Sequence, residues 1–556
     1  MRTLDWVVLV GSTLVIVLYG LYKGRGSGTV SSYLLANRSM PWWAMGLSIM
    51  ATQASAITFI GTTGQSYVDG MRFVQFYFGL PLAMVILSAT AVPFFHRAGV
   101  YTAYEYLERR FDPKTRTLTA LVFLVQRGLG VGIALYAPAV VLSVIFGWSD
   151  RWTVVLMGVL VIAYTVFGGI KAVTWTDVQQ MAIMFVGIIA ALTSAVLLLP
   201  GHMSLGDALF LAGASGKLNA VDLSFDWTNR YNLWSGLIGG MFLALSYFGC
   251  DQSQVQRYLT GRSLRHMRVS LIFNAGMKVP MQFLILLTGA LVFVFFLFEP
   301  PPMLFHRAER ERVSGMTAYG EVESRYREAF AARREAAQAL LQSRDAPAAE
   351  RFEAARRRFD AARADGIKLT GGPYNDTNYV FLTFVTRYLP TGIVGLILSA
   401  IFAAAMSTIS AELNSLATTT VIDLYQRHVR PGASDSHYVL VSRLATGFWG
   451  VYAMGFALFG NRLGSLIEAV NMIGSLFYGS VLGVFVLAFF VPRATGTGAC
   501  TGLAAGLATV WWMNRYTGIS YLWFNVAGCL VVVAVGAMMG RGLQGASEGR
   551  RLAGRP

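Results

Sequence analysis

The sequence predicts an all-α polytopic membrane protein, on the evidence of its composition, the length of its apolar segments and the placement of its charges. Of 556 residues, 55% are apolar and 13% are charged, whereas soluble domains contain about 25% charged residues. Apolar segments recur at the length of about 20 residues that a membrane-spanning helix needs. Because the charges gather between these segments, the net charge of +16 does not indicate a nucleic-acid partner.

Thirteen segments meet this length criterion. The first has no clear basic leader and no small-residue cleavage site, so we expect it to be a span and not a signal peptide. The candidate spans lie at 5–22, 41–66, 73–95, 117–146, 152–169, 175–200, 232–250, 269–298, 389–411, 439–460, 464–492, 498–514 and 519–540.

The basic residues predict the orientation of the chain. They concentrate in alternate loops, with groups at 97–116, 257–268 and 427–443 and in the tail after residue 540, while Arg127 and Lys278 fall inside spans. The positive-inside rule places these loops in the cytoplasm. We therefore expect a multi-pass protein of the plasma (inner) membrane, with its N-terminus outside and its C-terminus cytoplasmic.

Residues 306–368 interrupt the apolar pattern with a segment rich in Ala, Arg and Glu. Sparse apolar positions predict a helical hairpin that breaks near Asp345-Ala346-Pro347. This insert lies outside the membrane on the expected topology. A solvated cap or a contact in a homo-oligomer is one interpretation, since charge runs are usually solvated faces; a substrate-recognition lid is the other.

The span at 41–66 has a polar centre of hydroxyls, an amide and small residues, which include Thr52, Gln53, Ser55 and Thr58. Such a run is unusual for a helix interior, whereas a helix that unwinds at the membrane midplane exposes carbonyls that bind a cation. Close packing between helices is the alternative explanation for the small residues.

A second polar cluster occurs beyond the apolar start of the span at 389–411, where Ser407 and Thr408 supply hydroxyls and Glu412 a carboxylate that cannot face lipid. Sodium is a hard cation, and hydroxyl and carbonyl oxygens can replace part of its water shell. Two such clusters suggest one shared cation site, although Ser and Thr often only bond back to their own helix.

Four stretches of the chain carry a resemblance to a known family. They are SAITFIGTTGQSYVDGMRF at 55–73, GGIKAVTWTDVQQ at 168–180, DQSQVQR at 251–257 followed by Lys278 and Pro280, and MSTISAELNSLATTTVIDLY at 406–425. Together they resemble the sodium/solute symporter family, whose members carry sugars, proline, monocarboxylates, vitamins, iodide or sialic acid with sodium.

The resemblance implies a LeuT-like core of two five-helix inverted repeats, each with a broken first helix. It divides the chain into a first span and cytoplasmic loop (1–40), a first repeat (41–200), the start of the second repeat (201–298), the charged insert (299–376), the rest of the second repeat (377–492) and two final spans with a basic tail (493–556).

The resemblance also implies a sodium site. Its ligands would be the carbonyls of Ala51, Ala54 and Ala404 and the hydroxyls of Ser407 and Thr408. Asp177 resembles a family carboxylate on the inner sodium path, which belongs to a second sodium site in some members. The alternative for Asp177 is a charge at a helix N-terminus near the cytoplasmic surface.

The expected substrate-binding residues follow partly from the family and partly from the polar second span. Lys278 matches a family lysine near the substrate of a sugar carrier, and Tyr247 an aromatic gate; alternatively, Lys278 neutralises a carboxylate such as Asp251 or Glu412. Thr58, Tyr77 and Ala244 stand where a galactose carrier has Gln, Glu and Asn, which argues against that sugar mode. The full candidate set is Gln53, Ser55, Thr58, Phe76, Tyr77, Tyr247, Lys278 and Asn471.

We therefore expect a secondary active transporter that imports a small organic solute or anion with co-transported sodium by alternating access. The second span looks closer to the monocarboxylate, vitamin and iodide branch, but a sugar-type solute stays open. An enzyme is not expected, because the six histidines are dispersed and form no metal-binding motif. The remaining alternative is a substrate sensor that acts through a separate signalling partner.

Overall fold

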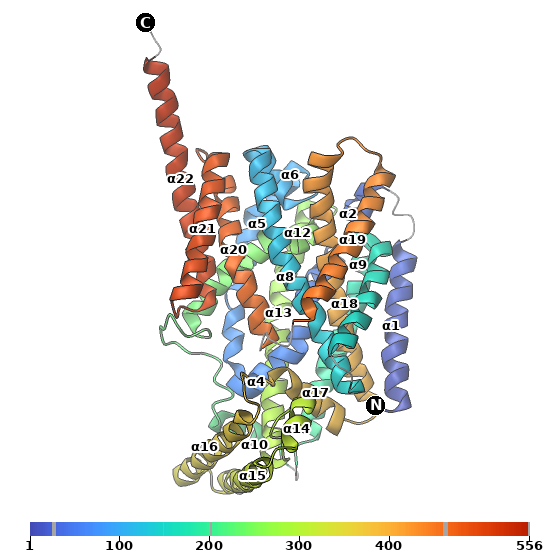
Figure 1. Ribbon diagram of the computed structural model, residues 1–556, viewed down its shortest axis with the longest axis vertical. Helices are drawn as coiled ribbons and strands as arrows, with labels where there is room; N and C mark the ends of the chain where they lie inside the picture. Colours follow the sequence, from blue (N-terminus) through green and yellow to red (C-terminus); the bar gives the residue numbers. More distant parts are fainter. Residues whose placement is uncertain (25–28, 148–149, 201–202, 460–464, 554–556) are drawn as a thin grey trace.

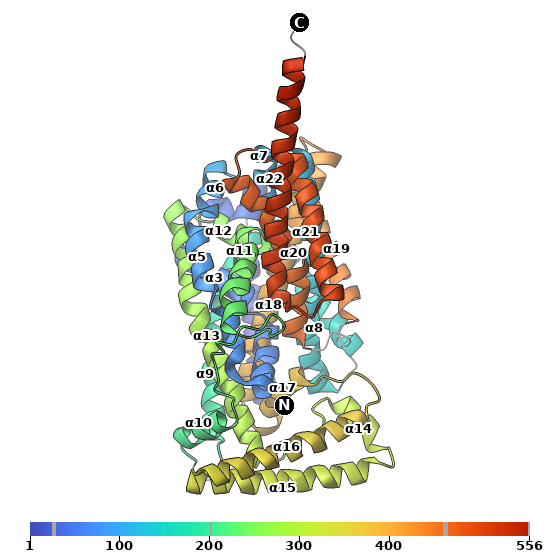
Figure 2. The ribbon, with the colours of Figure 1, turned by 90° about the vertical axis from the view of Figure 1, so that its left-hand side faces the viewer.

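The computed structural model describes residues 1–24, 29–147, 150–200, 203–459 and 465–553. Its long elements in these ranges are helices, as the sequence predicts. They stand side by side in one bundle, with the N-terminus at the end that carries α14–α16 and the C-terminal helix projecting from the opposite end (Figures 1 and 2). Termini at opposite ends agree with an odd number of crossings.

The first half of the chain comprises α1 Thr3–Gly24, α2 Val30–Leu35, η1 Ala36–Arg38, α3 Trp42–Gln53, η2 Thr58–Thr62, α4 Thr63–Asp69, η3 Gly70–Tyr77, α5 Leu80–Ala89, α6 Ala91–Ala98, α7 Ala103–Arg110, α8 Pro113–Phe146, α9 Asp150–Leu197 and α10 Leu205–Ala214. The second half comprises η4 Ser235–Gly239, α11 Gly240–Gly249, α12 Gln252–Leu259, α13 Leu264–Phe298, α14 Arg307–Ser314, α15 Tyr319–Ser343, α16 Ala346–Lys368, α17 Thr377–Tyr388, α18 Ile393–Thr419, η5 Thr420–Val429, α19 Asp435–Ala457, α20 Leu466–Phe490, α21 Gly496–Tyr516 and α22 Tyr521–Ala553.

Among the described residues, nine helices are long and apolar enough to cross a membrane. They are Thr3–Lys23, Thr58–Ala98, Pro113–Ser143, Gly169–Leu197, Leu264–Phe298, Ile393–Val429, Asp435–Ala457, Leu466–Phe490 and Tyr521–Met539. The other expected spans, at 41–66, 152–169, 232–250 and 498–514, coincide with helices that are shorter, interrupted or less apolar. The centre of the bundle is formed by α18 and α13, whose apolar windows are 89% and 83% buried.

The first helix of each repeat is broken near its middle. In the first repeat, α3 ends at Gln53, Ala54 leaves the helical region (φ −86°, ψ 75°), and the chain continues through the π-helical η2 into α4. In the second, α11 ends at Gly249, and Asp251 (φ −80°, ψ 120°) caps α12 by accepting a hydrogen bond from the Ser253 N–H. These breaks match the inverted-repeat core that the sequence predicts.

Helix α9 contains two of the expected spans, 152–169 and 175–200, joined at a kink. Gly169 has a φ of 60°, and a Cβ added there would lie 2.9 Å from a ring carbon of Tyr33 and 3.0 Å from its carbonyl oxygen. Only glycine fits both this left-handed conformation and this close approach. The kink therefore separates two membrane segments without a loop.

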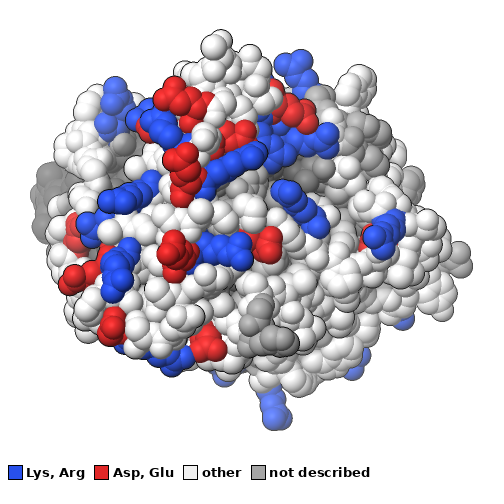
Figure 3. Space-filling model, turned by 90° about the horizontal axis from the view of Figure 1, so that it is seen from below, with Lys and Arg blue, Asp and Glu red and all other residues white. Residues whose placement is uncertain are grey.

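The insert folds as the predicted hairpin of α15 and α16. Helix α15 ends with Arg344 in the left-handed region (φ 53°), and Asp345 caps α16 through the Ala348 N–H at 2.8 Å. A small core that includes Tyr326 and Phe359 lies between the helices. Seen from below, this face of the molecule mixes basic and acidic side chains (Figure 3). Most of their ion pairs join residues three or four apart on one helix, as expected for a solvated face.

Candidate functional site

The break in the first repeat lies against α18. The Thr408 hydroxyl donates a hydrogen bond to the Thr52 carbonyl at 3.1 Å. Because the last carbonyls of a helix have no partner within it, the end of α3 presents oxygens toward this junction, and the Thr408 oxygen keeps lone pairs for a further contact. The residues whose carbonyls are expected to bind sodium, Ala51, Ala54 and Ala404, are all fully buried.

Asp177 joins this region from α9. Its two carboxylate oxygens accept hydrogen bonds from the Ser407 hydroxyl at 2.6 Å and from the Ser48 hydroxyl at 2.5 Å. The side chain is fully buried, and the part of α9 that carries Asp177 begins at the Gly169 kink, about two turns earlier. The alternative of a surface charge at a helix N-terminus is therefore wrong. Three helices, α3, α9 and α18, thus bring one carboxylate and two hydroxyls together beside the Thr52–Thr408 contact.

A cavity of about 100 Å³ lies directly next to the break. Thr52 and Thr408, which form the junction, also belong to its wall. Of the candidate substrate-binding residues, all but Lys278 line it: Gln53, Ser55, Thr58, Phe76, Tyr77, Tyr247 and Asn471. Candidates from α3, the segment after the break, η3, α11 and α20 are therefore brought to one place.

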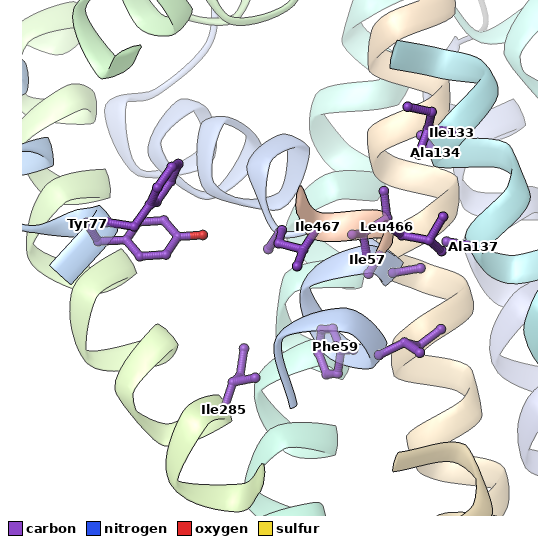
Figure 4. Close-up of a cluster of buried hydrophobic side chains, with 14 of the residues drawn as sticks. Ile57, Phe59, Tyr77, Ile133, Ala134, Ala137, Ile285, Leu466 and Ile467 are labelled. Carbon is purple, nitrogen blue, oxygen red and sulfur yellow. The ribbon is translucent and has the colours of Figure 1, made fainter. Parts of the chain in front are cut away.

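One side of the cavity is apolar. Figure 4 shows Ile57, just after the break, beside Ile467 at the start of α20, with the Tyr77 ring turned toward them. All three residues line the cavity and are at most 5% exposed. These side chains give part of the cavity wall an apolar surface.

Lys278 lies behind Tyr77 and not in the cavity wall. Its ammonium group is 5.6 Å from the centre of the Tyr77 ring, and the side chain is fully buried. Among the described residues it has no hydrogen-bond partner. The expectation that Lys278 neutralises Asp251 or Glu412 is wrong, because another cation pairs with both.

That cation is Arg127 of α8, which falls inside an expected span but is absent from the predicted site residues. It donates to Glu412 at 2.7 Å, to the Tyr478 hydroxyl at 2.7 Å and to Asp251, and its guanidinium stacks 5.3 Å from the centre of the Tyr247 ring. Arg127, Glu412 and Tyr478 also line the cavity. The signal was available in principle: Asp251 and Glu412 directly follow two of the expected spans, and carboxylates at such positions require a buried partner.

Residues 33–302 and 359–506 match the family described as "Sodium:solute symporter family". The chain belongs to this family. The gap between the two matched segments falls on the hairpin insert, so the insert interrupts a core that is otherwise shared along the chain.

Related symporters match over most of their length. The sodium-dependent multivitamin transporter of Oryctolagus cuniculus is 29% identical over 92% of this chain and 70% of its own length. The sodium-coupled monocarboxylate transporter 1 of Mus musculus is 30% identical over 92% of this chain and 73% of its own length. A solved structure of a Na⁺-coupled sialic acid symporter in a substrate-bound outward-open state has a TM-score of 0.77, with 23% identity over 97% of this chain and 98% of that one.

Membership settles the class of protein. The chain is a membrane-spanning, sodium-coupled symporter and not an enzyme, as the sequence predicts. Sodium is its coupling ion and a small solute its cargo. The LeuT-like inverted-repeat fold is likewise confirmed.

Proposed function

We propose that this symporter imports a small organic anion, a monocarboxylate or a vitamin-like carboxylate, across the plasma (inner) membrane together with sodium. The observation that carries the proposal is the double role of Thr52 and Thr408: they form the contact between α3 and α18, and they line the cavity. An ion bound at this contact would shape the wall that the solute meets. This is the arrangement that direct coupling requires.

In this proposal, sodium binds the carbonyls of Ala51, Ala54 and Ala404 and the hydroxyls of Ser407 and Thr408. Sodium then ties α3 to α18 and stabilises a form that binds the solute, after which the bundle moves and exposes both to the other side. The membrane potential adds about 2.3 kcal/mol per charge per 100 mV to inward movement. No covalent step is needed.

Asp177 is proposed as part of a second sodium site or of the sodium exit path. A carboxylate and two hydroxyls offer the oxygen ligands that a hard cation prefers. The hydroxyl of Ser407 lies between Asp177 and the first proposed site, because it donates to Asp177 from the residue next to Thr408. An ion could therefore pass from one set of oxygens to the other without leaving them.

For the solute, the charge of Lys278, which has no hydrogen-bond partner among the described residues, supports an anion over a neutral sugar, whereas the charge of Arg127 is already matched by Asp251 and Glu412. Arg127 lines the cavity and Lys278 stands behind its wall at Tyr77. The volume of about 100 Å³ suits a solute of few atoms and favours a small monocarboxylate over a vitamin-sized one, since larger ligands occupy roughly 300–1,000 Å³. We propose Gln53, Ser55, Thr58, Phe76, Tyr77, Tyr247 and Asn471 as its contacts, and Lys278 as a charge that acts through Tyr77.

The orientation completes the proposal. With the basic loops in the cytoplasm, the end that carries the N-terminus and α14–α16 is extracellular, and the C-terminal helix extends into the cytoplasm. Cysteine accessibility to an impermeant reagent in intact cells would test this, with one cysteine introduced at the exposed Arg357 and one at the exposed Arg430.

Uptake into proteoliposomes tests the mechanism. Ser407→Ala and Thr408→Ala should raise the sodium concentration needed for half-maximal uptake at least several-fold, because each removes a proposed ligand. Ser415→Ala is the matched control, since its buried hydroxyl only bonds back to the carbonyl of Glu412 on the same helix. Unchanged sodium dependence in the two site variants would remove the sodium assignment.

The same vesicles distinguish a carrier from a sensor that signals through another protein. A carrier accumulates sodium when solute is added, with a fixed ratio of sodium to solute. Solute-dependent signalling without such flux would favour the sensor.

A further inference from the structure

Glu412 has one carboxylate oxygen that the fold does not use. Its Oε1 accepts a hydrogen bond from Arg127 Nη1 at 2.7 Å, while Oε2 is buried and has no hydrogen-bond partner among the described residues. The side chain is 4% exposed and lines the cavity, one helical turn beyond Thr408. A buried carboxylate oxygen without a donor is costly, so this atom calls for a donor from a ligand.

Arg127 is the natural place for a solute carboxylate, but most of its donors are taken. Its Nη1 is bonded to Glu412, and its Nη2 to Asp251 and to the Tyr478 hydroxyl. Among the described residues only its Nε lacks a partner within the guanidinium group. One cation therefore serves two buried carboxylates, and this end of the cavity is formally negative by one charge.

A plain carboxylate would fit this end badly. It would add a second uncompensated negative charge and would leave Oε2 of Glu412 without a donor. A hydroxyl or ammonium group on the carbon next to the carboxylate supplies the missing donor, and an ammonium group also cancels the added charge. The carboxylate of such a solute can reach the Nε of Arg127 and the hydroxyls near the helix break, and its donor can bond to Oε2.

We infer that Glu412 is a specificity-determining residue that selects small carboxylates with a hydrogen-bond donor on the carbon next to the carboxylate, such as 2-hydroxy or 2-amino acids. This inference rests on the proposed function and refines its solute class. The hydroxyl and ammonium groups share the chemistry that matters here, which is donation to one carboxylate oxygen.

Three probes of nearly equal shape test the inference. Lactate, alanine and isobutyrate share a three-carbon carboxylate frame and differ in one group, a hydroxyl, an ammonium or a methyl. Sodium-dependent thermal stabilisation of the purified full chain gives the affinity for each. At least one of lactate and alanine should bind about tenfold or more tightly than isobutyrate, because isobutyrate leaves the buried oxygen unpaired.

Variants then assign the preference to Glu412. Glu412→Met removes the acceptor and leaves Arg127 paired with Asp251, so isobutyrate should bind within about threefold of the better probe. Glu412→Gln keeps a carbonyl oxygen that can accept a hydrogen bond but removes the negative charge, so alanine, whose ammonium group gains from that charge, should weaken more than lactate. Tyr478→Phe disturbs Arg127 without touching the acceptor and should shift the affinities for all three probes alike. If Glu412 had only a structural role, its own variants would show the same uniform shift. Glu328→Gln, exposed on α15, is the remote control.

The results separate this inference from the symport proposal. Equal sodium-dependent binding of isobutyrate and its polar analogues, an unchanged preference in both Glu412 variants, or no binding of lactate or alanine would each overturn the role of Glu412. Stabilisation by sodium alone, lost in Ser407→Ala, would leave the symporter mechanism intact in all these cases. Solute binding that ignores sodium would instead contradict the proposed coupling.

Discussion

The Arg127 cluster offers the most direct test of how the bundle is held together at its centre. Arg127, Asp251 and Glu412 have side chains that are 4%, 1% and 4% exposed. Arg127→Met leaves two carboxylates buried without a cation, and breaking a buried ion pair in this way costs about 3–5 kcal/mol. With two partners stranded, we expect a loss at the upper end of that range.

The compensating variant sharpens this prediction. Combining Arg127→Met with Asp251→Asn and Glu412→Gln removes the stranded charges, and we expect it to recover at least about 2 kcal/mol, because residues in one network are not additive. Unfolding in mixed micelles with increasing SDS, followed by tryptophan fluorescence, gives the free energies. Arg230→Met is the control, because its ion pair with Glu468 is 50% and 25% exposed and should be worth about 0–1 kcal/mol.

Two outcomes would refute the reasoning. A loss of less than about 1 kcal/mol in Arg127→Met would mean that the carboxylates find water or protons at no cost, contrary to the penalty for buried charges. A triple variant as unstable as Arg127→Met alone would mean that the loss comes from packing against Tyr247 and not from unpaired charge.

Two further predictions concern regions outside the spans. Burial lowers the pKa of Lys217 to about 8, where it donates to the Val68 carbonyl and lies over the Phe293 ring. Above about pH 8 the folded chain has lost this proton, but the unfolded chain keeps it until about pH 10.5. Between these values the unfolding free energy of the wild type should therefore rise relative to that of Lys217→Met. Parallel curves of unfolding free energy against pH would contradict this. Asp376→Asn removes the negative charge and one of the two acceptors in the paired 2.8 Å contacts with Arg363 that fasten α16 to α17. It should lower the unfolding free energy by about 1.5–3 kcal/mol; an unchanged value in the same SDS titration would show that the insert is held by other contacts.

Local chemistry explains which parts of the fold could be predicted. The break after Gln53 follows from a run of polar and small residues that a continuous apolar helix would not contain, and the hairpin turn follows from Asp345 and the proline after it. Neither depends on distant parts of the chain. The kink at Gly169 was not predicted, because a single glycine inside an apolar run gives no signal of the Tyr33 ring that packs against it.

The charged end of the cavity is built from residues that lie far apart in the sequence. Arg127 meets Glu412 across 285 residues and Asp251 across 124. Hydropathy and motifs place each residue in or next to a span but do not rank possible partners, and Lys278 was an equally reasonable cation for both carboxylates. Only the packing of α8 against α18 and α20 decides in favour of Arg127.

The contact between Thr52 and Thr408 leads to a last prediction, on coupling itself. If sodium strengthens solute binding by a given factor, linkage requires solute to strengthen sodium binding by the same factor, typically about 5–150-fold. Since the Thr408 hydroxyl belongs both to the proposed ion site and to the cavity wall, Thr408→Val, which keeps the shape, should bring both factors close to one. Thr408→Ser keeps the hydroxyl and should preserve them. The two factors can be measured by titrating sodium with and without solute, and solute with and without sodium. If the coupling survives in Thr408→Val, it passes through the packing of α3 against α18, because the valine retains that packing and loses only the oxygen.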